Sequence, residues 1–170
     1  MRRTVSTLAL GLIAAVGVAA VATSCGDDST GPSGKTYVAA NMNAAAEGGG
    51  FTSAGTGTVT FVDLGNEIAW SMNLTNMTAV TVSHIHLGDA TANGAPGNPP
   101  AGPVIINLYL PNGPSGLLNG QVAHGFITNA SNANVSLDSL RVLLNNGHAY
   151  ANVHTTAHSG GEIRAQIAPQ

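Results

Sequence analysis

The feature that most constrains the fold is a succession of short runs in which apolar and polar residues alternate. Alternate residues of a β-strand point to the same side, so each run is typical of a strand with one apolar face. About eight such runs are separated by turns rich in Gly, Pro and Asn. They cover 36–44, 57–64, 67–74, 79–87, 104–110, 120–128, 149–155 and 161–168. Gly65-Asn66, between the second and third runs, is a two-residue hairpin signal.

One segment has a different period. In 136–147, SLDSLRVLLNNG, apolar residues recur at near-helical spacing. Ser136 can cap the start of a helix there and Gly147 can end it. Many short strands without alternating βαβ units favour an antiparallel arrangement. We therefore expect an all-β fold, an antiparallel Greek-key-like β-sandwich of about eight strands with one short helix.

The beginning of the chain is predicted to be a leader. Two arginines, a long uncharged stretch and small residues before the only cysteine form a secretory signal layout. The segment ATSC resembles a bacterial lipoprotein signal, in which the cysteine is lipidated and becomes the mature N-terminus. We expect a lipoprotein signal peptide over 1–24, lipidation at Cys25, a flexible tether over 25–35 and the folded domain over 36–170. Ordinary secretion and a retained membrane anchor are the alternatives.

This layout predicts a protein of the cell envelope, outside the cytoplasm and bound to a membrane through its lipid. If Cys25 is lipidated, no thiol remains for a disulfide or a nucleophile. Five Lys and Arg against eight Asp and Glu provide no basic surface, so we expect no nucleic-acid partner. The sequence lacks the Gly-x-Ser-x-Gly elbow of hydrolases and a phosphate-binding Gly loop, so no catalytic residue is assigned and enzyme activity is not favoured.

Four motifs occur in order along the domain: HIH at 84–86, a Gly/Pro-rich loop leading to GPV at 102–104, AYANVHT at 149–155 and GEIRAQ at 161–166. Together they resemble the chordin-type, or CHRD, domain family. The family occurs in chordin, an extracellular antagonist of bone morphogenetic proteins, and in bacterial secreted proteins and lipoproteins. The resemblance implies an extracytoplasmic location and a β-sandwich more than a particular activity. A non-catalytic module that binds an extracellular or envelope protein is the function it favours.

His84 and His86 suggest an alternative function. Side chains at this spacing on a strand share one face, and His154 ends another strand whose outer face is polar. Three imidazoles can bind copper or zinc, with water, His158 or Glu162 in a fourth position. The chain could then store metal or carry out redox chemistry. In the competing interpretation His84 and His86 hydrogen-bond loop carbonyls and fix the loop over 88–103.

Three further polar residues are interpreted as structural. Glu162 and Arg164 share a strand face and are expected to form a partly buried ion pair, with each other or with neighbours. Asn152 is expected to satisfy backbone groups at a strand end or turn. His124 and His148 are expected at the surface.

Overall fold

The computed structural model describes residues 34–88, 102–131 and 134–170. The predicted signal peptide, Cys25, most of the tether and most of the loop over 88–103 lie outside the described residues. The elements are β1 (Thr36–Met42), α1 (Ala44–Glu47), β2 (Thr56–Asp63), β3 (Ile68–Met77), β4 (Val80–Leu87), β5 (Val104–Tyr109), β6 (Leu118–Ile127), α2 (Leu137–Asn146), β7 (Ala149–Thr155) and β8 (Ile163–Pro169).

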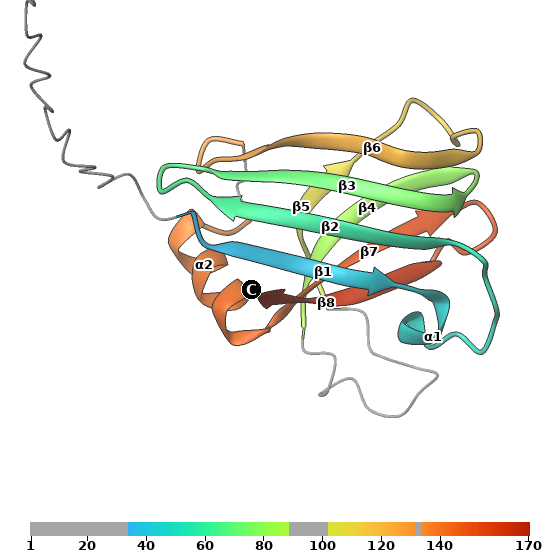
Figure 1. Cartoon of the computed structure of the whole chain (residues 1–170), viewed down its shortest axis with the longest axis horizontal. Coiled ribbons are helices and arrows are strands. Elements are labelled where there is room, and N and C mark those ends of the chain that lie inside the picture. Colours follow the sequence, from blue (N-terminus) through green and yellow to red (C-terminus); the bar gives the residue numbers. More distant parts are fainter. Residues whose placement is uncertain (1–33, 89–101, 132–133) are drawn as a thin grey trace, which may run out of the picture.

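The strands pair antiparallel in the order β5-β4-β7-β8-β1-β2-β3-β6. Figure 1 shows β1, β2, β3 and β6 in one layer, with β4, β5, β7 and β8 in a second layer behind it. The pairing of β1 with β8 joins the layers along one side. Strands β3 with β6 and β4 with β7 are neighbours although they are not consecutive, so the chain crosses between the layers. The predicted all-β antiparallel fold is confirmed.

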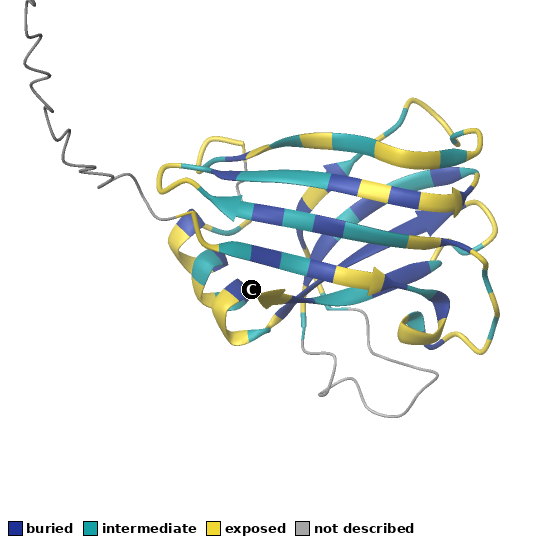
Figure 2. Ribbon diagram, in the orientation of Figure 1, coloured by how far each residue is buried: buried dark blue, intermediate teal, exposed yellow. Residues whose placement is uncertain are grey.

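The hydrophobic core lies between the two layers. Apolar residues from both inner faces are completely buried there, among them Phe61 of β2, Met72 of β3, Ile85 of β4 and Ile163 of β8. Figure 2 shows buried residues alternating with more exposed ones along β2 and β3, whose outer faces meet solvent. Strand β7 differs, since all seven of its residues are buried. Its outer face must therefore also be covered.

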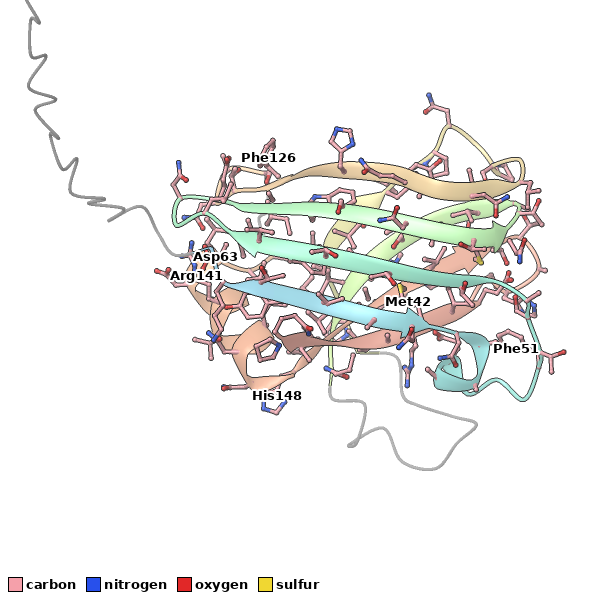
Figure 3. All side chains as sticks on the ribbon, viewed as in Figure 1. Met42, Phe51, Asp63, Phe126, Arg141 and His148 are labelled. Carbon is pink, nitrogen blue, oxygen red and sulfur yellow. The ribbon has the colours of Figure 1, made fainter. Side chains whose placement is uncertain are left out.

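The predicted helix is present as α2. The Ser136 hydroxyl accepts a hydrogen bond from the amide of Ser139, and Gly147 ends the helix with a left-handed φ of 66°. The apolar positions Leu137, Leu140 and Leu144 are buried against the core. On its outer side the helix is tied to the β2–β3 hairpin by an ion pair of Arg141 with Asp63, 2.8 Å from Nε to Oδ2 (Figure 3).

One helical turn was not predicted. The first strand was expected to reach residue 44, but Asn43 ends it and caps α1, its Oδ1 accepting a 2.9 Å hydrogen bond from Ala46 N. Gly48, with φ 82°, ends this turn. Figure 1 shows α1 beside β8, on which it packs. Within 34–88, 102–131 and 134–170, no helix has the length and apolar character that a bilayer crossing requires.

Candidate metal centre

Three histidines that are distant in sequence meet on the outer face of the second layer. His84 and His86 lie on β4, and His154 lies on the neighbouring strand β7, where it is the register partner of Val82. Residues paired directly across antiparallel strands share one face, so all three imidazoles lie on the same side of the layer. One potential ligand atom from each histidine lies within 4.8 Å of the others. The strand register thus assembles the predicted trio.

The environment of His86 leaves one of its nitrogens available. Its Nδ1 lies 2.7 Å from the Gly102 carbonyl oxygen, which can only accept, so Nδ1 carries the proton. Its Nε2 is buried and has no hydrogen-bond partner. The Tyr150 ring stacks on the imidazole, 4.9 Å between centroids and 9° between planes, and the Tyr150 hydroxyl accepts from Gly102 N. This packing fixes both the orientation and the tautomer of His86.

His154 is arranged in the same way. Its Nδ1 donates to the Ser159 carbonyl oxygen at 2.8 Å, so in the neutral ring Nε2 carries a lone pair. That Nε2 lies 3.2 Å from Nδ1 of His84. Metal-binding histidines in proteins commonly donate their second ring N–H to a carbonyl or carboxylate. Two of the three histidines have this support from backbone carbonyls.

The electrostatics keep the imidazoles neutral. Burial, with the neighbouring His154 and His86, lowers the pKa of His84 to about 4. Burial also lowers the pKa of His86 and of His154, although the Gly102 and Ser159 carbonyls partly oppose it. The unprotonated nitrogen of an imidazole is the metal-binding one. At neutral pH the group is therefore in the form that a metal ion requires.

The polar residues predicted to be structural surround this group. Asn152 is the register partner of both His84 on β4 and Arg164 on β8. It lies within β7 instead of at a strand end, and its buried Oδ1 has no hydrogen-bond partner, so the expected bonds of this oxygen to backbone groups are absent. Arg164 is 6% exposed, donates from Nε to the Ala46 carbonyl at 2.7 Å, and places its guanidinium carbon 4.8 Å from the Tyr150 ring centroid.

The prediction that Glu162 and Arg164 form an ion pair is wrong for the described residues. The ion pairs found there join Arg141 to Asp63 and Asp138. Glu162 accepts hydrogen bonds from Ser53 and Thr155, each at 2.6 Å. The Thr155 hydroxyl in turn accepts from His158 N. Because Ser159 follows directly, this chain of contacts supports the loop that supplies the carbonyl to His154.

His158 and Glu162, two of the three candidates suggested for a fourth position, do not lie with the trio, since the group of potential ligands in the described part of the chain contains only the three histidines. The His158 ring stacks on Phe51, with centroids 3.8 Å apart, and both Glu162 oxygens are engaged elsewhere. His124 and His148 are exposed, as predicted.

The bond from His86 to Gly102 is of the kind expected in the competing interpretation, a hydrogen bond to a carbonyl of the 88–103 loop, although Gly102 itself was not singled out. Sequence reasoning did not identify Tyr150 or Ser159 as parts of the site. Gly102 and Ser159 act through backbone carbonyls, which any residue type has, so composition and spacing carry little signal for them. Tyr150 could have been found, because it precedes His154 by an even number of residues and shares its strand face.

The fold and the site together define an all-β domain whose polar outer face carries a supported group of histidines. Comparison with protein families gives a match to the CHRD domain over residues 33–167, so the chain belongs to the CHRD domain family. A search of curated proteins and a search of solved structures each returned no match.

Proposed function

We propose that this protein is a lipid-anchored CHRD-domain protein of the cell envelope that binds copper or zinc through His84, His86 and His154. One observation carries the metal proposal: the buried, unpartnered Nε2 of His86 lies in a group of imidazoles whose ligand atoms are within 4.8 Å of one another. A buried polar atom without a partner is costly, by roughly 1–3 kcal/mol. A bound cation would remove that cost.

The donor set suits these metals. Neutral imidazole nitrogen is a usual ligand of zinc and copper, and three histidines with an open position are found in reactive zinc sites. The 3.2 Å contact of His84 Nδ1 with His154 Nε2 requires one shared proton in the metal-free protein. A metal ion would take the place of that proton. The protein would then either store copper or zinc or carry out chemistry at the bound ion.

Metal content measured by mass spectrometry tests the proposal. The purified protein is incubated with copper or zinc and dialysed, beside His154→Ala and the control His124→Ala, which alters an exposed histidine of β6. About one metal ion per chain is expected in the wild type and the control, with little in His154→Ala. Circular dichroism checks that every variant is folded. A folded wild-type protein that retains no metal would refute the metal function.

The location rests on the N-terminal sequence. A secretory layout that ends in ATSC before Cys25 supports export, lipidation of the cysteine and attachment to a membrane.

Binding of another envelope protein is the second candidate. The connection from β5 to β6 presents Leu110 and Leu117, which are 65% and 67% exposed. Exposed large apolar residues mark contact surfaces more often when they lie together. A Leu110→Ser and Leu117→Ser double variant should then lose an envelope partner recovered by cross-linking while its metal content is unchanged. Equal cross-linking in the two proteins would argue against this candidate.

A further inference from the structure

Asn152 occupies the centre of the histidine group. It is the direct register partner of His84, so the two side chains project side by side from β7 and β4. His154 lies two residues further along β7, on the same face. His86 is the diagonal neighbour of Asn152 across the two strands. The Asn152 side chain therefore has all three imidazoles as neighbours.

The Asn152 side chain is also deeply buried, and its amide oxygen has no partner. The residue is 2% exposed, and its Oδ1 has no hydrogen-bond partner. Nε2 of the neighbouring His86 is likewise buried without a partner, and it carries a lone pair because Nδ1 donates to Gly102. Two neighbouring acceptors with no donor between them repel each other.

An electrophile shared by these two atoms resolves the repulsion, and a metal ion bound by the three histidines is such an electrophile. We propose that the Asn152 amide oxygen is the fourth protein donor of this site and that the site therefore prefers a divalent ion, Zn(II) or Cu(II), to Cu(I). Amide oxygen is a hard donor, whereas monovalent copper is bound best by soft sulfur ligands. This inference rests on the proposed metal function and specifies its ligand set.

The other polar neighbours of Asn152 are engaged elsewhere. Arg164 donates to Ala46 and lies over the Tyr150 ring, and a guanidinium offers no lone pair to a metal. The alternative amide is Asn107 of β5, the second register partner of His84, but it is exposed. Solvent can satisfy an exposed amide, whereas the buried one needs a partner within the protein.

The decisive experiment compares metal affinities of four proteins: the wild type, Asn152→Leu, Asn152→Asp and the control Asn107→Leu. Competition with a chromogenic chelator gives the dissociation constants of Zn(II) and Cu(II), and a Cu(I) chelator under reducing conditions gives that of Cu(I). Asn152→Leu removes the oxygen and keeps the shape of the side chain. We expect it to weaken the binding of Zn(II) and Cu(II) by about 10- to 100-fold, the range seen when residues around a metal site are removed. The change in Cu(I) affinity should be much smaller. Asn107→Leu should match the wild type.

Asn152→Asp keeps an oxygen donor and adds a negative charge, so divalent binding should be at least as tight as in the wild type. This variant also decides the matter if Asn152→Leu does not fold, because a weaker affinity in Asn152→Asp would overturn the inference. Unchanged divalent affinity in a folded Asn152→Leu protein would mean that the amide only hydrogen-bonds to His86, which would overturn it as well. In either case metal binding by the wild type would still support the proposed function, whereas a wild type that binds no metal would refute both.

Discussion

His84 Nδ1 and His154 Nε2 lie 3.2 Å apart although 70 positions separate the two residues in the chain. The two residues lie on the paired antiparallel strands β4 and β7 and are diagonal neighbours there, since His84 pairs with Asn152 and His154 pairs with Val82. Each ring has a second contact. Nδ1 of His154 donates to the Ser159 carbonyl, and the ring of His84 lies beside that of His86, with 5.4 Å between the centroids. The contact is thus a product of the β4–β7 pairing.

The stability of the metal-free protein should fall in mild acid. The folded-state pKa of His84 is lowered from 6.5 to about 4, mainly by burial, so below pH 6.5 the unfolded chain binds protons that the folded chain does not. The contribution of neutral His84 to the free energy of unfolding is therefore fully present above pH 6.5 and is lost as the pH falls toward 4. Urea unfolding followed by Trp70 fluorescence across this range measures it. His84→Gln should show a shallower decline, and an identical slope in the two proteins would contradict the assignment.

Gly102→Ala should weaken metal binding without altering a ligand. A Cβ at this position would collide with the Leu87 carbonyl oxygen, so the backbone must move. That movement displaces the Gly102 carbonyl from Nδ1 of His86 and its amide from the Tyr150 hydroxyl. Loss of such support commonly lowers metal affinity by about 10- to 100-fold.

Titration with a chelator compares this variant with Gly116→Ala, a substitution in the β5–β6 connection where an added Cβ meets no neighbouring atom. Gly116→Ala should bind metal as the wild type does. Equal affinities of all three proteins would show that the Gly102 carbonyl does not orient His86.

Removal of the Arg141 side chain should destabilise the fold. Arg141 donates to both Asp63 oxygens, at 2.8 and 3.0 Å, and to the Gly65 carbonyl, and so fastens α2 to the β2–β3 hairpin. The Arg141 and Asp63 side chains are 22% and 17% exposed, which places the pair between surface and buried ion pairs. We expect Arg141→Ala to lower the free energy of unfolding by about 1–2 kcal/mol.

A double-mutant cycle with Asp63→Ala isolates the interaction of the pair. The decreases in the free energy of unfolding of the two single variants should add up to more than the decrease in the double variant. Strict additivity would mean that the Arg141–Asp63 ion pair contributes nothing to stability and that Arg141 acts through its contacts with Gly65 and Asp138.

Cys25→Ser should release the protein from the membrane. A lipidated cysteine is required for attachment in the proposed layout, since two or more acyl chains anchor a protein firmly. Fractionation of cells should move the variant from the membrane to the soluble fraction, and mass spectrometry should show acyl chains on the wild type only. Wild-type protein that carries a free thiol and remains in the membrane would indicate a retained anchor instead.

Much of the fold could be predicted because its signals are local. Alternation marks each strand, Gly65-Asn66 marks a hairpin and Ser136 with Gly147 marks the ends of α2. The turn α1 was missed because four residues are too short for a helical period, and only the Asn43 cap distinguishes it from a continued strand. Ion-pair partners were also mistaken: Glu162 lies just before β8 and Arg164 within it, and Ser53, Thr155 and Ala46 approach from other segments and take their hydrogen bonds.

The sequence alone therefore determined the all-β class, the family and the three histidines that can act together, since periodicity, turn residues and ordered motifs are properties of neighbouring positions. The tertiary structure decided how close those histidines lie to one another and what surrounds them. Only the pairing of β4 with β7 brings His154 to His84. Burial of that face is the largest cause of the lowered pKa of His84, and it leaves His86 Nε2 and Asn152 Oδ1 without partners. Burial and register depend on segments far apart in the chain, so no local pattern encodes them.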